Sequence, residues 1–221
     1  MFNPYMQSPL HQFDLPAKAK SPDESCGIWA NELPLLGYVI LRGNVADPVF
    51  VEGVNKTLNM ALPTRPCTFS RGEAGTLLWL SPDEWLLSCP RNRVEALISD
   101  LESTLAGMHI QIVDNSGGLT QIYLTGREHI TLLRHVGVYD FESITPGKVI
   151  GTACGKATIV AYRLDGQGLF VIFRRSFADY VWRLLERAGQ PYGFGICTLP
   201  TDKNTHTTVK STSSNTALLS A

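Results

Sequence analysis

One order of predicted elements occurs twice along the chain, and it limits the folds open to it. Each copy is predicted to contain a strand, a helix, two hairpin strands and a second helix. In the first copy the strands cover 38–41, 76–80 and 85–89, and the helices start at 48 and cover 92–106. In the second the strands cover 121–124, 157–164 and 169–174, and the helices cover 128–136 and 176–189. Gly126 lies 83 residues after Gly43, and Phe170 lies 85 after Trp85, so the near-constant offset indicates a duplication.

This order predicts an α+β fold. We expect two duplicated ferredoxin-like βαββα halves, with mostly antiparallel sheets and helices on one face of each sheet. A half of about 75 residues would bury only a marginal core, so the halves are expected to fold as one unit. The helix over 92–106 needs such a sheet, because its apolar residues share one face: Val94, Leu97, Ile98, Leu101 and Leu105.

The two ends of the chain lack the periodic apolar residues that indicate strands and helices in its middle. We expect a mobile N-terminal segment over 1–32, a single domain over 33–198 and a disordered polar tail over 199–221. Residues 201–221 are almost entirely small and polar. Such ends bury too little apolar surface to offset the cost of ordering, about 1 to 2 kcal/mol per residue for the backbone.

Charge and hydropathy exclude two kinds of partner. The chain has 19 basic and 20 acidic residues and a formal net charge of -1, so it offers no basic field for nucleic acid. Its longest strongly apolar stretch, 33–41, is interrupted by Pro34 and Gly37 and is shorter than the roughly 20 residues that cross a bilayer. The N-terminal residues do not fit a secretory signal either, and we infer a cytoplasmic location.

Motifs for catalysis, cofactors and metals are missing from the sequence. The 5 cysteines are widely separated, without a Cys-x-x-Cys pair, and are expected to be reduced. No two histidines have metal-ligand spacing, and Gly117-Gly118 lacks the spacing of a nucleotide loop. Ser116 is not in a Gly-x-Ser-x-Gly elbow; an Asx-type turn accounts for it, and a loop facing a partner or ligand stays the alternative. We therefore predict no catalytic, cofactor-binding or metal-binding residue in this chain.

The segment 79–87 (WLSPDEWLL) reads as a hairpin, with turn residues between two apolar strands. Neighbouring residues in an extended segment point to opposite sides, so Asp83 and Glu84 cannot share a proton. Asp83 is expected to order the turn, and Glu84 to meet solvent or a partner.

The last predicted helix offers a candidate interface. Arg174 and Arg175 precede it and could form bidentate contacts with a carboxylate or phosphate, or surface salt bridges. Tyr180 and Trp182 stand two apart on the helix and so face differently, which leaves one of them for a surface. Exposed aromatics anchor interfaces, and we predict partner contacts at Arg174, Arg175, Tyr180 and Trp182.

Together, segments 79–87 (WLSPDEWLL) and 174–182 (RRSFADYVW) resemble the gamma subunit family of heterotetrameric sarcosine oxidase. The order of the elements between them, including Val113–Gly117, 124–126 and Pro146-Gly147, is similar too. The resemblance covers about 35–190.

The resemblance implies a fold similar to the folate-binding domain of aminomethyltransferases. It also implies a non-catalytic subunit in a complex with alpha, beta and delta subunits. In that family the partners hold FAD, NAD and FMN, and sarcosine is demethylated to glycine with 5,10-methylenetetrahydrofolate and hydrogen peroxide as products. This chain would itself bind none of the flavins, NAD or tetrahydrofolate.

Three alternatives stay open from the sequence. The chain could belong to a related complex that oxidises N-methylglutamate. It could be a free-standing folate-binding module or aminomethyltransferase-like protein, although fold analogy alone does not establish activity. It could also be a structural protein of an unrelated complex.

Overall fold

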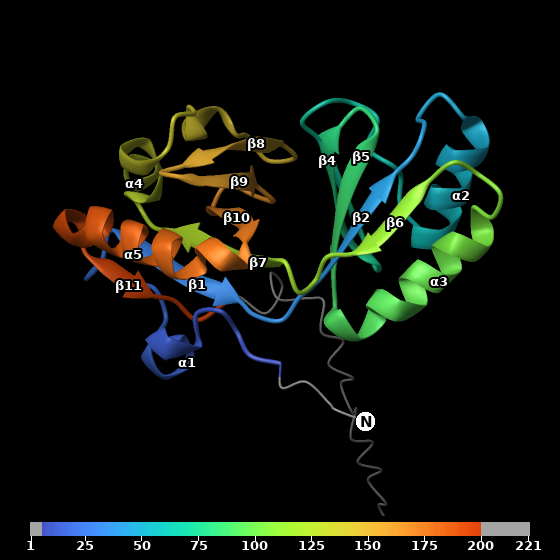
Figure 1. Cartoon of the computed structure of the whole chain (residues 1–221). Helices are drawn as coiled ribbons and strands as arrows, with labels where there is room; N and C mark the ends of the chain where they lie inside the picture. The colour runs from blue at the N-terminus through green and yellow to red at the C-terminus, as the bar shows by residue number, and fades with distance from the viewer. Residues whose placement is uncertain (1–5, 200–221) are drawn as a thin grey trace, which may run out of the picture.

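A computed structural model describes residues 6–199 and places helices outside two facing sheets (Figure 1). The first sheet has the order β3 (Phe69–Gly72), β4 (Gly75–Ser81), β5 (Glu84–Cys89), β2 (Gly37–Arg42) and β6 (Gln111–Asp114). The second has the order β11 (Phe194–Ile196), β1 (Ile28–Leu33), β7 (Leu119–Thr125), β10 (Gly168–Arg174), β9 (Ala157–Tyr162) and β8 (Val149–Cys154). The main helices are α2 (Pro48–Leu58), α3 (Val94–Thr104), α4 (His129–Val136) and α5 (Ala178–Gly189).

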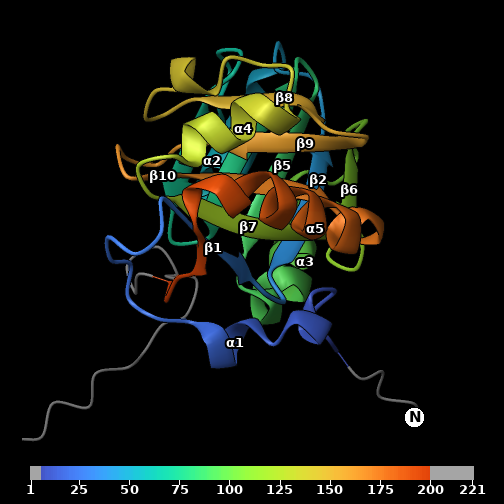
Figure 2. The same cartoon turned by 90° about the vertical axis from the view of Figure 1, so that its left-hand side faces the viewer.

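The sheet order confirms the predicted α+β fold with two ferredoxin-like halves. In the first half the order β6-β2-β5-β4 places the first strand of the unit, β2, between the third and the fourth. The second half repeats β7-β10-β9 in the same way, and its edge strand β8 corresponds to β3. The helices of each half lie on one face, α2 and α3 on the first sheet and α4 and α5 on the second (Figures 1 and 2).

The strand β1 breaks this symmetry. It pairs antiparallel with β7, the place that β6 occupies beside β2, and the final strand β11 pairs parallel with its outer side. All six of its residues are buried. The domain start predicted at residue 33 is therefore wrong, because it excludes most of this interior strand. The polar residues Asn31 and Glu32 are not typical of a strand that is buried on both faces, so the sequence did not indicate one.

Parts of the N-terminal segment before β1 are also packed against the core. It contains a short 3₁₀ helix (His11–Phe13) and α1 (Leu15–Lys18). Leu10 and Leu15 are buried in the same core as α5, and the Phe13 ring lies 6.0 Å from that of Trp182. These contacts are made with residues far away in the sequence. The segment has no local apolar period, so the sequence did not predict them. The predicted tail over 199–221 lies, except for residue 199, outside the described residues.

The helices form because their local sequence and one apolar face agree. The side chain of Asp47 accepts a hydrogen bond of 2.9 Å from the Val49 backbone N–H and caps α2, with Pro48 in the first turn, as predicted. In α3 the predicted stripe faces the first sheet, with Val94, Leu97 and Leu101 buried. Each helical layer thus covers one face of its own sheet.

The faces without helices pack against each other and form a third core. Alternating strand residues supply it, so that Leu86 points into this core while its neighbours Trp85 and Leu87 point toward the helices. A row of aromatic rings crosses from the second sheet to the first: Tyr123, Phe170, Tyr162 and Phe69. Their successive centroid distances are 4.9, 5.0 and 5.4 Å. The two halves therefore share a buried interface, as expected of a single folding unit.

The predicted hairpin is confirmed as β4 and β5, with Trp79 directly opposite Trp85. Trp85 is fully buried, its ring lies 5.7 Å from that of Phe50 on α2, and its Nε1–H donates 2.8 Å to the Pro63 carbonyl. Asp83 orders the turn as predicted, because its carboxylate accepts a 2.8 Å hydrogen bond from the Ser81 hydroxyl. The hairpin is a structural element of the first half.

The two tryptophans should contribute unequally to stability. Trp85→Ala is expected to lower the free energy of unfolding by about 3 to 5 kcal/mol, since it leaves a cavity and an unpaired Pro63 carbonyl. Trp79→Ala, at a half-buried position, should cost about 1 to 2 kcal/mol. Urea denaturation of both variants measures the difference, and equal losses would contradict the packing described.

Candidate functional site

The two halves are joined by two short connections that lie side by side (Figure 1). One, 34–36, links β1 to β2, and the other, 115–118, links β6 to β7. The Asn115 N–H donates 2.8 Å to the Tyr38 carbonyl, and the Tyr38 N–H donates 2.9 Å to the Ser116 hydroxyl. The Arg175 N–H, just after β10, donates 2.8 Å to the Gly118 carbonyl. Three distant parts of the chain therefore converge at this point.

A small cavity of about 250 Å³ opens at this convergence, and we call it the junction cavity. The wall is formed by the N-terminal segment, both connections and the first residues of two 3₁₀ turns, Arg91–Arg93 before α3 and Arg175–Phe177 before α5. The wall combines aliphatic and polar side chains. Its residues are Met6, Gln7, Pro9, Leu33, Leu35, Leu36, Tyr38, Arg91, Ser116, Gly117, Leu119, Thr120 and Arg175.

A buried carboxylate, Glu32, ties the wall together from β1. It accepts hydrogen bonds from the hydroxyls of Ser8 and Thr120, the latter at 2.6 Å. Burial raises the pKa of Glu32 above its ordinary value, although these two hydrogen bonds and the charge of Arg175 act in the opposite direction. The hydroxyls of Ser8 and Thr120 both donate to Glu32. This carboxylate therefore holds the N-terminal segment and β7 in place.

The guanidinium of Arg175 lines the cavity and is only partly engaged. It donates 2.6 Å to the carbonyl of Gln7, which holds the N-terminal segment over the junction. Within residues 6–199, no carboxylate lies at ion-pair distance from it. Arg91, also on the wall, is paired with Asp114 at 3.1 Å. Arg175 therefore retains donors for a further acceptor.

Two buried polar atoms near the junction have no partner among the described residues. They are the hydroxyl of Tyr38 and the side-chain carbonyl of Gln121. Tyr38 is 1% exposed and lines the cavity, and burial raises the pKa of its hydroxyl well above the usual range. Buried polar groups are nearly always hydrogen-bonded. The region around the junction therefore has unused hydrogen-bonding capacity at these two atoms.

The rim of the cavity carries a strained, exposed leucine. Leu35 has φ 57°, a left-handed conformation that side chains other than Gly and Asn rarely adopt. Its side chain is 42% exposed, and that of Met6 beside the same cavity is 59% exposed. Strain of this kind costs of order 1 kcal/mol or more, and it concentrates at functional sites.

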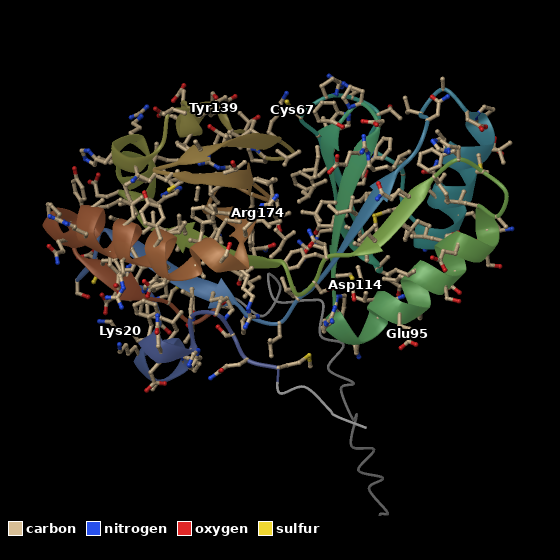
Figure 3. The ribbon with its side chains drawn as sticks, viewed as in Figure 1. Lys20, Cys67, Glu95, Asp114, Tyr139 and Arg174 are labelled. Carbon is tan, nitrogen blue, oxygen red and sulfur yellow. The ribbon has the colours of Figure 1, made fainter. Side chains whose placement is uncertain are left out.

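The four predicted interface residues do not form one surface. Arg174 is exposed at the end of β10 (Figure 3), while Arg175 lines the junction cavity. Tyr180 is 37% exposed, and its hydroxyl accepts a 3.0 Å hydrogen bond from the Lys156 N–H. Trp182 is fully buried between Phe13 and Phe194, so a partner contact there does not fit this structure. The prediction that Tyr180 and Trp182 face differently is confirmed.

Other groups considered in the sequence have structural partners. The Asp83 carboxylate accepts 2.6 Å from Arg42, and hydrogen bonds from Ser81 and Arg42 lower its pKa. Ser116 lies in the predicted Asx-type turn, formed by Asp114, which accepts a hydrogen bond of 2.9 Å from the Ser116 N–H. Within residues 6–199, no three metal-ligating side chains cluster, and none of the helices has both the length and the apolar character that a membrane crossing requires.

Sequence reasoning missed Glu32, Leu35 and Tyr38. Glu32 carried a usable signal, because it is one charge within the otherwise uncharged run 25–31 and 33–41. A charge inside a strand that is buried on both faces needs hydrogen-bond partners. Leu35 carried none, since its backbone conformation follows from the connection that Pro34 begins.

One family model matches this chain. The model of the family described as "Sarcosine oxidase, gamma subunit family" matches residues 42–190, which span both halves. No curated protein matches the chain by sequence.

Two solved structures are similar in fold. A chain of heterotetrameric sarcosine oxidase from Corynebacterium sp. U-96, in complex with pyrrole 2-carboxylate, has a TM-score of 0.75 at 21% identity. The match covers 84% of this chain and 95% of that one. Aminomethyltransferase T of the glycine cleavage system from Bartonella henselae has a TM-score of 0.62 at 14% identity, over 87% of this chain and 60% of that one. At these identities the likeness shows the fold alone.

The raised pKa of Glu32 predicts a pH-dependent stability. The folded chain holds this proton more tightly than the unfolded chain, so the free energy of unfolding falls as pH rises from 4.5 through the higher folded pKa. The slope is at most about 1.4 kcal/mol per pH unit. The variant Glu32→Gln has no titratable group at this position. Its free energy of unfolding, relative to that of the wild type, should therefore rise over the same pH range.

Urea denaturation at a series of pH values measures that difference. Glu95→Gln, at an exposed position on α3 (Figure 3), is the matched control and should leave the pH profile unchanged. A difference between Glu32→Gln and the wild type that stays flat with pH would contradict a desolvated Glu32.

Proposed function

The chain belongs to the sarcosine oxidase gamma subunit family, and we propose that it acts as the gamma subunit of a heterotetrameric sarcosine oxidase. The observation that carries this proposal is the family match over 42–190, which covers most of both ferredoxin-like halves. The likeness to a chain of a heterotetrameric sarcosine oxidase over 95% of that chain's length supports it. The partners would be the alpha, beta and delta subunits, in the cytoplasm.

We propose that this subunit assembles the complex without carrying out its chemistry. The junction cavity supports this role, because no carboxylate is among the residues that line it, and the nearby buried Glu32 is hydrogen-bonded to Ser8 and Thr120. No histidine or cysteine is among the residues that line it. Oxidative demethylation of sarcosine, with FAD, FMN, NAD and tetrahydrofolate, would then take place in the partner subunits.

The fold suits an assembly role. Each sheet is covered by helices on one face and by the other sheet on its second face, so the subunit presents preformed surfaces. Interfaces between preformed surfaces lose less conformational freedom on binding than those that must order first.

A second candidate is a free-standing folate-binding module or aminomethyltransferase-like protein. The likeness to aminomethyltransferase T favours it, but this chain covers only 60% of that protein. The junction cavity, at about 250 Å³, is also smaller than the roughly 300 to 1,000 Å³ of pockets for drug-sized ligands. A gamma subunit of an N-methylglutamate dehydrogenase is the alternative within the same architecture.

Co-expression with the alpha, beta and delta subunits tests the proposal. The chain is expected to co-elute with them in size-exclusion chromatography, and the isolated chain should not oxidise sarcosine. Elution of this chain alone, while the other subunits assemble normally, would refute the assignment. Calorimetric titration with tetrahydrofolate is the second arm, and tight binding to the isolated chain would favour the folate-binding alternative.

A further inference from the structure

We propose that the rim of the junction cavity is a docking surface for another subunit of the oxidase, and that an acidic side chain of that subunit enters the cavity. This inference rests on the proposed function, which supplies the partner.

The apolar part of the surface lies on the rim. Met6 and Leu35 are 59% and 42% exposed and line the same cavity, although both are large aliphatic side chains. Leu33, Leu36 and Leu119 continue the apolar wall inward. A pocket with an apolar rim is the arrangement that receives an anchor side chain at protein interfaces.

The backbone at Leu35 supports a role in binding. Gly and Asn are the residues that adopt a left-handed backbone conformation most easily. This chain has a leucine in that conformation at position 35, with φ 57°. The leucine is only partly buried within this chain, because 42% of it is exposed. Contact with a partner would bury the remainder.

The polar groups of the wall call for an acceptor. The hydroxyls of Thr120 and Ser116 already donate to Glu32 and Asp114. Arg175 has donors left after its bond to Gln7, and the buried Tyr38 hydroxyl has no partner among the described residues. A guanidinium has no acceptor, so the group that completes this wall must bring one, and a carboxylate suits Arg175 best.

A second exposed apolar patch is surrounded by different charged groups. Val138 and Tyr139, after α4, are 86% and 40% exposed. The nearby Arg134 is paired with both Asp140 and Glu142, so its guanidinium already has carboxylate partners. Figure 3 shows Tyr139 at the top of the molecule, far from Asp114 beside the junction. That patch provides a matched control surface.

The variant Leu35→Asn separates binding from folding. Asn tolerates the left-handed backbone, so the isolated chain should be as stable as the wild type or more so. Its affinity for the co-expressed partner subunits should nevertheless fall about tenfold or more, as for an interface anchor. Val138→Asn makes the same change at the control surface and should leave the affinity unchanged.

The variant Arg175→Gln tests the charge. It should weaken assembly about tenfold, whereas Arg174→Gln, at the exposed neighbouring position, should not. Both pairs of variants are measured by biolayer interferometry of the full chain against the purified partner subunits, with urea denaturation of each variant alone.

The outcomes distinguish this inference from the proposed function. If the wild-type chain does not bind the partner subunits at all, the proposed function fails, and this inference with it. If it binds them and Leu35→Asn and Arg175→Gln bind equally well, only the docking surface is refuted. Loss of affinity in Val138→Asn alone would place the interface after α4. Stabilisation of the isolated wild-type chain by millimolar benzoate, absent in Arg175→Gln, would assign the cavity to a small carboxylate instead.

Discussion

Each half of this chain covers only one face of its sheet with helices, and the other face is too apolar to stay in water. Burial of these two faces against each other is the constraint on which the rest of the structure depends. Aromatic rings from both sheets meet there, from Tyr123 through Phe170 and Tyr162 to Phe69. Each fully buried side chain of this size contributes about 1.5 to 3 kcal/mol, so neither half is expected to be stable alone.

The junction follows from that packing. With the sheets face to face, both connections between the halves must cross at one end, where residues 34–36 and 115–118 are hydrogen-bonded through Tyr38. At the opposite end the Val149 N–H donates 3.0 Å to the Cys67 carbonyl and closes the second side. Insertion of β1 beside β7 then brings Glu32 to the crossing. The cavity and its strained rim are consequences of how the halves are joined.

Duplication was predictable from the sequence because each half repeats its turn and apolar signals at a nearly constant offset. The hairpin, the capped helix α2 and the stripe of α3 were found for the same reason, since each depends on neighbours in the sequence. The strand β1 was not predictable, because Asn31 and Glu32 are typical of a polar chain end. Glu32 is buried only because Thr120 and Ser8, from distant parts of the sequence, donate hydrogen bonds to it. The burial of Trp182 likewise depends on Phe13 and Phe194, which lie far away in the sequence.

The central claim is that the chain assembles a complex through the surface around the junction cavity. Hydrogen exchange of the full chain, alone and in the co-purified complex, tests it most directly. We expect the backbone N–H groups of 35–37, 116–120 and 175–176 to exchange more slowly in the complex, while those of 137–140 are unchanged. Unchanged exchange at the junction, with new protection elsewhere, would contradict it.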